Sequence, residues 1–191
     1  MEDAGEAEKA ELKNKKHLLH LTLEFGPLRC HLVGMKEVAE ALQPHPNLKS
    51  LRIDWYQVKE WPRWMMEPSL PQLTQLILFC CDCQCLPPLG DLPLLESLEI
   101  KWMGQVKYVG GEFLGSSSKI AFPRLKHLSF EGMLEWENWE VKEEKGRKVM
   151  PWLLSLKIDR SPKLTALPDL LLQRTPPIKI KWDKEEIGGS S

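Results

Sequence analysis

A short apolar phrase, LxxLxL, recurs along this chain and predicts most of its structure. Leu73, Leu76 and Leu78 form one copy, at positions 1, 4 and 6 of the phrase. Six further copies, the last of them degraded, are Leu18, Leu21 and Leu23; Leu48, Leu51 and Ile53; Leu95, Leu98 and Ile100; Leu125, Leu128 and Phe130; Leu153, Leu156 and Ile158; and Thr175, Ile178 and Ile180. Side chains alternate along a β-strand, so positions 4 and 6 share one face. The phrase therefore predicts seven short strands, each with one apolar face.

The copies return at a nearly regular interval, which indicates a repeat architecture. Position 4 recurs after 22 residues, from Leu76 to Leu98, and after at most 30 residues, from Leu21 to Leu51. One such unit cannot bury its leucines alone, but stacked units cover one another. Leucine-rich repeats have periods of roughly 20–29 residues. We therefore expect an α/β leucine-rich repeat solenoid, a horseshoe with a parallel concave β-sheet and a convex side of short helices and irregular segments.

The segments between the copies predict the convex side and the limits of the domain. Met35 to Leu42 has apolar and charged residues at helical spacing, whereas paired prolines and a glycine in Leu86 to Pro93 exclude a regular helix. Residues 110–119, rich in Gly and Ser, and the charged residues 140–148 are expected to be loops. The expected limits are residues 1–17 for the convex-side helix of a truncated first repeat, 18–182 for about seven repeats and 183–191 for a disordered tail.

Composition narrows the class of function. The 191 residues are 42% hydrophobic and 28% charged, and a net charge of −1 gives no global field to attract nucleic acid or an anionic membrane. The longest apolar run, Leu76 to Cys81, is too short to cross a bilayer, and Met1 to Glu11 is acidic, unlike a secretory signal. Five cysteines, an odd number, do not resemble a disulfide framework. We therefore expect a cytoplasmic protein without nucleic-acid or membrane partners.

The outward positions of the expected sheet carry the candidate binding residues. Positions 5 and 7 point away from the core, and position 8 follows each strand at the edge of the concave face. Aromatic residues and arginine on a rigid surface are typical of protein-binding hot spots, and the mixed charges at position 7 favour specificity. A second interpretation, in which the rings at position 8 cover the core edge, stays open. The candidate partner-binding residues are Phe25, Arg52, Asp54, Trp55, Phe79, Glu99, Lys101, Trp102, Glu131, Lys157, Asp159, Arg160, Lys181 and Trp182.

Four cysteines between Cys80 and Cys85 offer a different chemistry. Cys80 and Cys83 have the CxxC spacing of a zinc site, but no second CxxC and no histidine pair follows. Cys81 falls at position 9 of its repeat, where a small polar group caps backbone amides inside the turn. This pattern favours structural cysteines in a reducing cell over a thiol or zinc site. The five histidines are scattered and show no catalytic order, so we expect neither enzyme activity nor a cofactor.

Two further expectations concern packing. Tryptophan pairs in EWPRW (Trp61 and Trp64) and EWENW (Trp136 and Trp139) each follow a strand directly. We expect these rings to pack beneath the return loops. The first strand, from residue 18, has no capping repeat before it in the sequence, and an uncovered strand edge invites association. Poor solubility of the isolated chain is therefore expected.

The copies and their flanking residues together resemble the leucine-rich repeat region of plant coiled-coil nucleotide-binding disease resistance proteins. The matching passages, in the order of that family, are AELKNKKHLLHLTLEF, EALQPHPNLKSLRI, LPPLGDLPLLESLEI, GGEFLG, AFPRLKHLSFEGMLEWENWE and MPWLLSLKIDRSPKLTALP. The resemblance implies a non-catalytic sensor and autoregulatory region of an intracellular immune receptor that acts in defence against pathogens. It also implies protein partners: a pathogen effector, a host guardee or the nucleotide-binding domain of a receptor.

The chain departs from that family because it contains no nucleotide-binding segment. The pattern GxxxxGK[ST] is absent, and Gly110 to Gly115 is followed by Ser116 where a lysine is required. ATP-driven switching is therefore not expected. Met1 to Lys16 matches the convex-side helix of a repeat whose strand would lie upstream, so we interpret the chain as a fragment, a truncated product or a partial gene model. The alternative binding class is a substrate adaptor of a ubiquitin ligase, for which the first sixteen residues are too short and too polar to supply a ligase-docking segment.

Overall fold

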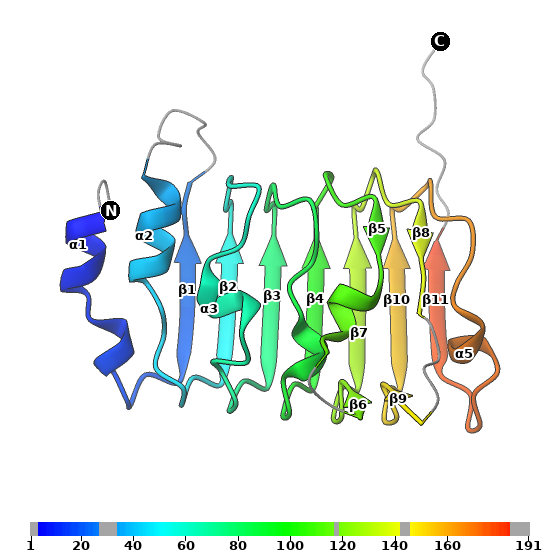
Figure 1. The fold of residues 1–191 in the computed structure, drawn as a ribbon. Coiled ribbons are helices and arrows are strands. Elements are labelled where there is room, and N and C mark those ends of the chain that lie inside the picture. Colours follow the sequence, from blue (N-terminus) through cyan, green and yellow to red (C-terminus); the bar gives the residue numbers. More distant parts are fainter. Residues whose placement is uncertain (1–3, 27–33, 117–118, 142–145, 184–191) are drawn as a thin grey trace, which may run out of the picture.

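Seven parallel strands form the main sheet of the computed structural model, which describes residues 4–26, 34–116, 119–141 and 146–183. The strands are β1 (His20–Glu24), β2 (Ser50–Asp54), β3 (Gln75–Phe79), β4 (Ser97–Lys101), β7 (His127–Glu131), β10 (Ser155–Asp159) and β11 (Lys179–Asp183). Their order in the sheet is β1-β2-β3-β4-β7-β10-β11, so each strand lies beside the strand of the next repeat (Figure 1). The expected solenoid with a parallel sheet is confirmed.

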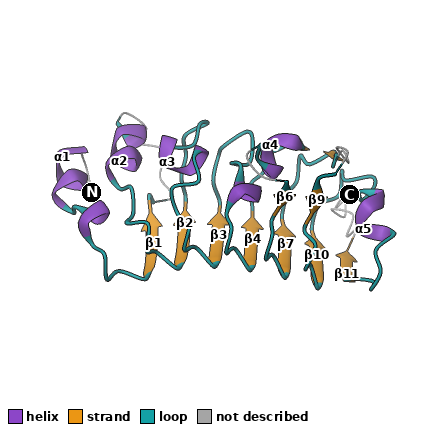
Figure 2. Ribbon diagram, turned by 60° about the horizontal axis from the view of Figure 1, so that its bottom comes forward, coloured by secondary structure: helices purple, strands orange, loops and turns teal. Residues whose placement is uncertain are grey.

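The return segments cover one side of this sheet with short helices and small strand pairs (Figure 2). The helices are α1 (Ala4–Lys9), α2 (Met35–Ala41), α3 (Arg63–Met66), α4 (Gly111–Leu114) and α5 (Asp169–Leu172), with 3-10 turns η1 (Leu12–Asn14) and η3 (Leu89–Asp91). Two strand pairs are β5 (Tyr108–Val109) with β8 (Asn138–Trp139), and β6 (Ile120–Ala121) with β9 (Lys148–Val149). We call the other side of the main sheet, which these segments leave open, the concave face.

The return segments agree with the sequence expectations except at a few points. Helix α2 occupies most of the expected helix, and the proline-rich segment forms only the 3-10 turn η3. The loop expected at residues 110–119 is wrong in its first half, because α4 forms there and buries Phe113 in the core. The expected first helix is interrupted at Glu11, whose φ of 46° is left-handed. Asp183, assigned to the tail, ends β11, and residues 142–145 and 184–191 lie outside the described residues.

Position 4 sets the register of the main sheet. It lies opposite position 4 of the next strand from β1 to β10, as the phrase predicts. In β11, however, Ile180 lies opposite Leu156 and Trp182 lies opposite Ile158. The seventh copy expected from the sequence, which placed Ile178 at position 4, is therefore wrong by two residues. A shift of two preserves the alternation of faces, so the apolar pattern alone could not separate the two registers.

The core is continuous and most complete in the middle of the sheet. The side chains at positions 4 and 6 of β2, β3, β4, β7 and β10 are all 2% exposed or less; they are Leu51, Ile53, Leu76, Leu78, Leu98, Ile100, Leu128, Phe130, Leu156 and Ile158. Burial of each such side chain contributes about 1.5–3 kcal/mol, which the ordering of the backbone largely offsets. At the two ends of the sheet, Leu21, Ile180 and Trp182 are only half-buried.

The four tryptophans of the EWPRW and EWENW segments pack beneath the return segments, as expected. All four are buried, and the ring centroids of Trp136 and Trp139 lie 5.3 Å apart. The Nε1–H groups of Trp61 and Trp64 donate to the carbonyls of Cys85 and Ala39, at 2.9 and 2.8 Å. These bonds satisfy the only polar side-chain atom of Trp61 and of Trp64 and fix their return segments against the core.

Candidate functional site

The outward residues of the strands form ordered ion pairs on the concave face. Arg52 Nε lies 2.8 Å from Asp54 Oδ2, and Lys101 Nζ lies 2.6 Å from Glu99 Oε2. A third pair joins Lys157 to Asp159 on β10, at 3.4 Å. Each pair links positions 5 and 7 of one strand, which share a face because side chains alternate. The concave face therefore carries both signs of charge, paired along β2, β4 and β10.

Position 8 has an uncommon backbone conformation after β2, β3, β4, β7 and β10. The φ angle is 60° at Trp55, 52° at Cys80, 58° at Trp102, 66° at Gly132 and 50° at Arg160. Left-handed φ is unfavourable for bulky residues and persists only where the surrounding structure enforces it. In these turns the position-8 amide donates to the position-7 carbonyl of the next strand, at 2.9 Å from Trp55 N and 2.7 Å from Trp102 N. These turns hold the side chains at the edge of the concave face.

An aromatic patch occupies the concave face over β2 and β3. The rings of Trp55 and Phe79 meet edge to face, with centroids 5.6 Å apart at 85°, and the guanidinium of Arg52 lies 5.4 Å from the Phe79 centroid. Ile77, at position 5 of β3, adds a half-buried aliphatic side chain. We call Arg52, Trp55, Ile77 and Phe79 the aromatic patch. Amphipathic rings in rigid, part-covered positions are typical anchors of protein interfaces.

A second aromatic group lies over β4, β7 and β10. The indole of Trp102 lies over Gly132, where an added Cβ would come within 2.5 Å of the ring. The guanidinium of Arg160 lies 5.4 Å from the Trp102 ring centroid and 3.8 Å from Glu131 Oε1. Because Gly132 has no side chain, it leaves room for the indole of Trp102, and Arg160 makes a cation–π contact with that ring.

A hollow of about 260 Å³ opens beside this group, above Ser129. Ser129 is a small residue between Glu99 and Lys157 in the register of the sheet, and both neighbours form ion pairs along their own strands. His127 and Ser155 share a hydrogen bond of 2.8 Å on its wall. The hollow is thus polar, open to the concave face and large enough for a side chain of a partner.

The structure divides the candidate residues of the sequence into three groups. Trp182 is wrong as a concave-face residue, because it lies at position 6 on the core side of β11, and Lys181 lies at position 5 instead of position 7. Phe25 packs edge-on against Tyr56, at 5.1 Å, and covers the core edge. The remaining candidates face outward, although Asp54 is only 8% exposed. The sequence analysis did not select four residues of this face: Ile77, His127, Ser129 and Ser155. The hollow had one signal in the sequence, a small residue at position 5 of one strand between long residues at position 5 of its two neighbours.

The cysteines between β3 and η3 have structural contacts. Cys81 Sγ–H donates to the Phe79 carbonyl at 3.5 Å, and Cys83 Sγ–H donates to the Val58 carbonyl at 3.1 Å. Burial raises the pKa of Cys81 to about 12 and also raises the pKa of Cys83. A thiol must lose its proton to bind zinc or to act as a nucleophile, so this environment disfavours the zinc and thiol interpretation.

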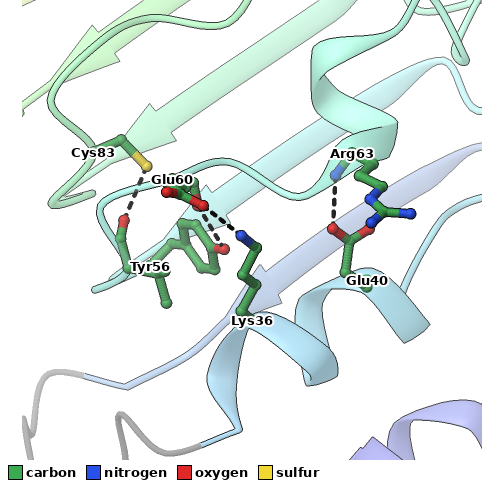
Figure 3. A network of polar contacts seen from close by, with 7 residues as sticks. Lys36, Glu40, Tyr56, Glu60, Arg63 and Cys83 are labelled. Carbon is green, nitrogen blue, oxygen red and sulfur yellow. Dashed lines mark hydrogen bonds and ion pairs between the residues drawn. The ribbon is translucent and has the colours of Figure 1, made fainter.

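A charged recess of about 660 Å³ lies on the opposite side, between α2 and α3 (Figure 3). Lys36 and Glu60 form an ion pair across it, and the Arg63 amide donates to Glu40 Oε1 at 2.9 Å. Tyr56, whose Oη–H donates to the Glu60 carbonyl at 3.0 Å, joins this network to the core. Its polar groups bind one another, so the network fixes two return segments together.

Comparison with known proteins agrees with this geometry. A parallel ladder with one buried face and one open face defines a leucine-rich repeat domain, and residues 1–103 match the family model described as R13L1/DRL21 LRRs. The chain therefore belongs to the R13L1/DRL21 family of leucine-rich repeats. The resemblance to plant disease resistance proteins is confirmed.

Three relatives are plant disease resistance proteins. The chain is 35% identical over 175 residues to the putative disease resistance protein At3g14460 of Arabidopsis thaliana, covering 84% of this chain and 12% of the relative. It is 33% identical over 171 residues to the disease resistance protein RGA2 of Solanum bulbocastanum, covering 84% and 17%. It is 31% identical over 189 residues to the putative disease resistance RPP13-like protein 1 of Arabidopsis thaliana, covering 88% and 18%. The chain thus spans less than a fifth of these relatives.

A solved structure supports the fold. The leucine-rich repeat domain of the type III effector XCV3220 (XopL) matches with a TM-score of 0.50 and 18% identity, over 86% of this chain and 61% of that domain. At this identity the match concerns the architecture alone.

Proposed function

We propose that this chain is a non-catalytic protein-interaction module, the leucine-rich repeat sensor and autoregulatory part of a cytoplasmic plant immune receptor. Membership of the repeat family and the identity of the relatives support the class. The observation that carries the proposal is the concave face, a rigid sheet whose outward side chains combine an aromatic patch, a Trp102–Arg160 stack and a polar hollow. Partners of the classes implied above, a pathogen effector, a host guardee or a nucleotide-binding domain, would contact this face.

The mode of recognition follows from the side chains. The aromatic patch offers apolar anchors, which supply most of the binding energy at protein interfaces. The ion pairs beside it offer charge of both signs, which discriminates between partners more than it raises affinity. Because the strands hold these groups in fixed rows, little ordering entropy is lost on binding.

Two further observations concern the described residues. Within residues 4–26, 34–116, 119–141 and 146–183, no group of three or more His, Cys, Asp or Glu side chains is placed to hold a metal ion. None of the helices in these ranges is long and apolar enough to cross a membrane.

The test uses a truncated RGA2 from which the matched segment has been deleted. Truncated RGA2 and the 191-residue chain are co-expressed in plant tissue, and capture of the chain is measured by immunoprecipitating truncated RGA2. The concave variant combines Trp55→Ala, Trp102→Ala, Lys101→Glu and Asp159→Lys. The matched control combines the exposed residues Tyr108→Ala, Trp152→Ala, Lys163→Glu and Asp169→Lys. Circular dichroism verifies that both variants fold.

We expect the concave variant to lose capture and the matched control to retain it. Equal capture of both variants would show that the concave face does not mediate the interaction. Loss of capture in the control alone would assign binding to the return segments.

A further inference from the structure

Charge is segregated along three strands of the main sheet, β7, β10 and β11. From the return segment up to position 6, residues 119–130, 146–158 and 170–182 each contain three Lys or Arg residues and no Asp or Glu. The next acid in each case stands at position 7, as Glu131, Asp159 and Asp183. These strands are therefore basic where they start and acidic where they end, a separation that the net charge of −1 averages out.

Four of these cations are exposed where the strands start, along the lower edge of Figure 1, where β6 and β9 also lie. Arg124 stands just before β7, and Lys179 is the first residue of β11. Lys119 and Lys148 lie side by side, because Lys148 N donates to the Lys119 carbonyl at 2.9 Å. Among the residues that the structure describes, none of the four cations takes part in an ion pair. Their charge is therefore available to an anionic partner.

The two most exposed large apolar side chains of the described residues lie on the same edge. Trp152 is 67% exposed and Leu154 is 57% exposed. The Leu154 amide donates to the Lys126 carbonyl at 2.8 Å, and the Leu154 carbonyl accepts from Lys179 N at 2.9 Å. These bonds place Leu154 between two neighbouring repeats, so its exposure does not come from a missing neighbour.

The turns before β7 and β10 hold Arg124 and Trp152 away from the core. In each turn a buried residue with left-handed φ, Phe122 at 53° or Met150 at 47°, is followed by a proline and then by the exposed residue. The amides of Phe122 and Met150 each donate, at 2.8 Å, to a carbonyl of the repeat before. Proline also fixes its own φ. Arg124 and Trp152 therefore project from equivalent places in two rigid, neighbouring turns.

This combination fits a bilayer surface better than a protein or a nucleic acid. Lysine is depleted in protein interfaces, and hot-spot rings there are surrounded by side chains that exclude water, whereas Trp152 projects among lysines. A phosphate backbone would bind the cations but would gain little from Leu154. The interface of an anionic bilayer accommodates all three kinds of side chain, because tryptophan lies at the headgroup level, leucine enters the acyl boundary and Lys or Arg contacts acidic headgroups.

We propose that this edge binds the surface of an anionic bilayer; we call it the basic edge and define it by Lys119, Arg124, Lys148, Trp152, Leu154 and Lys179. Such binding lies in the interface and needs no spanning helix. For this edge the proposal replaces the expectation, drawn from net charge, that the chain has no membrane partner, because net charge averages over both ends of the strands. The inference does not depend on the proposed function, which concerns the concave face.

Sedimentation with vesicles tests the role of charge. The 191-residue chain is mixed with vesicles of phosphatidylcholine and phosphatidylserine at about 3:1, or of phosphatidylcholine alone. We expect the chain to sediment with the anionic vesicles only, and less as salt is raised. Lys148→Glu with Lys179→Glu should weaken the partition by about tenfold or more. The matched control, Lys59→Glu with Lys107→Glu, makes the same change at exposed lysines that follow β2 and β4, and should have little effect.

Tryptophan fluorescence tests whether the apolar side chains enter the bilayer. Trp152 is the most exposed tryptophan of the described residues, so anionic vesicles should shift the emission to shorter wavelength, and Trp152→Phe should remove this shift. Trp152→Ala with Leu154→Ala should weaken the partition by about tenfold. The matched control is Met66→Ala with Leu172→Ala, two exposed apolar residues on α3 and α5. Circular dichroism verifies that all variants fold.

Three results would overturn the proposal. They are equal sedimentation with both kinds of vesicle or with neither, equal weakening by the basic-edge variants and their matched controls, and an undiminished fluorescence shift in Trp152→Phe. Tighter binding to double-stranded DNA or to polyglutamate than to the anionic vesicles at the same salt would also overturn it, and would assign the basic edge to that polyanion.

Discussion

The middle strands and the end strands of this sheet come from the same apolar phrase but differ in burial. Positions 4 and 6 are 2% exposed or less from β2 to β10, whereas Leu21 in β1 and Ile180 in β11 are half-buried. The described middle strands have a neighbour on each side and the end strands have one. In a repeat protein the phrase therefore specifies the strand, and the neighbouring repeats supply much of its stability.

The largest expected change in the free energy of unfolding comes from replacing a leucine in the middle of the sheet. Leu98→Ala, in β4, removes a side chain with no exposed surface and leaves a cavity, so it should lower the free energy of unfolding by about 2–5 kcal/mol. Leu21→Ala, the same change in β1, should cost only about 1 kcal/mol because the site is already half open. Urea unfolding followed by circular dichroism measures both. Equal losses would contradict a difference in stability between middle and ends.

The next largest change in the free energy of unfolding is expected from a substitution at Gly132, which follows the middle strand β7. Gly132 has a φ of 66°, and a Cβ there would contact the Trp102 ring at 2.5 Å. Gly132→Ala should therefore lower the free energy of unfolding by about 1–3 kcal/mol and displace the indole. Tryptophan fluorescence follows the displacement. Gly104→Ala is the control, because φ there is not left-handed and no heavy atom lies within 4 Å of an added Cβ.

Most of the fold could be predicted from the sequence because each inner phrase has a leucine or another large apolar residue at every inward position. The prediction was wrong where the phrase is degraded, at Ile178 and Ile180, because two registers separated by two residues give the same alternation. It also missed α4, since the glycines around Phe113 suggested a loop while the buried ring holds a helical turn in place. Local composition could not reveal that contact.

The candidate site was predictable only in part. Alternation identified the outward residues, but it could not show that Phe25 would pack against Tyr56 while Trp55 stays at the surface. Nor could it show the hollow above Ser129, which depends on how Glu99 and Lys157 lie along their own strands. Such features arise from contacts between repeats, which spacing within one repeat does not contain.

A smaller effect on the free energy of unfolding is expected at high pH from the buried thiol of Cys81, which follows β3. Burial raises the pKa of Cys81 to about 12 from its ordinary value of 9.0, so the folded chain keeps a proton that the unfolded chain loses. Stability from this group is complete below about pH 9 and falls as the pH rises toward 12, by up to about 1.4 kcal/mol per pH unit. Urea unfolding at pH 8, 9 and 10 measures the fall. Cys81→Ala should unfold more easily at pH 8 but show a weaker dependence on pH.

The smallest effect on stability, yet a large one on binding, is expected at Ser129. This residue is half-buried on the open face of β7, so Ser129→Leu should fill the hollow and change the free energy of unfolding by no more than about 0.5 kcal/mol. If partners insert a side chain there, the variant should lose capture by truncated RGA2 while keeping the stability of the original chain. Thr22→Leu makes the same substitution at position 5 of the end strand β1 and should leave capture intact. Retained capture with Ser129→Leu would show that partners do not insert a side chain into the hollow. Equal loss with both variants would show that added apolar surface, rather than the filled hollow, disturbs binding.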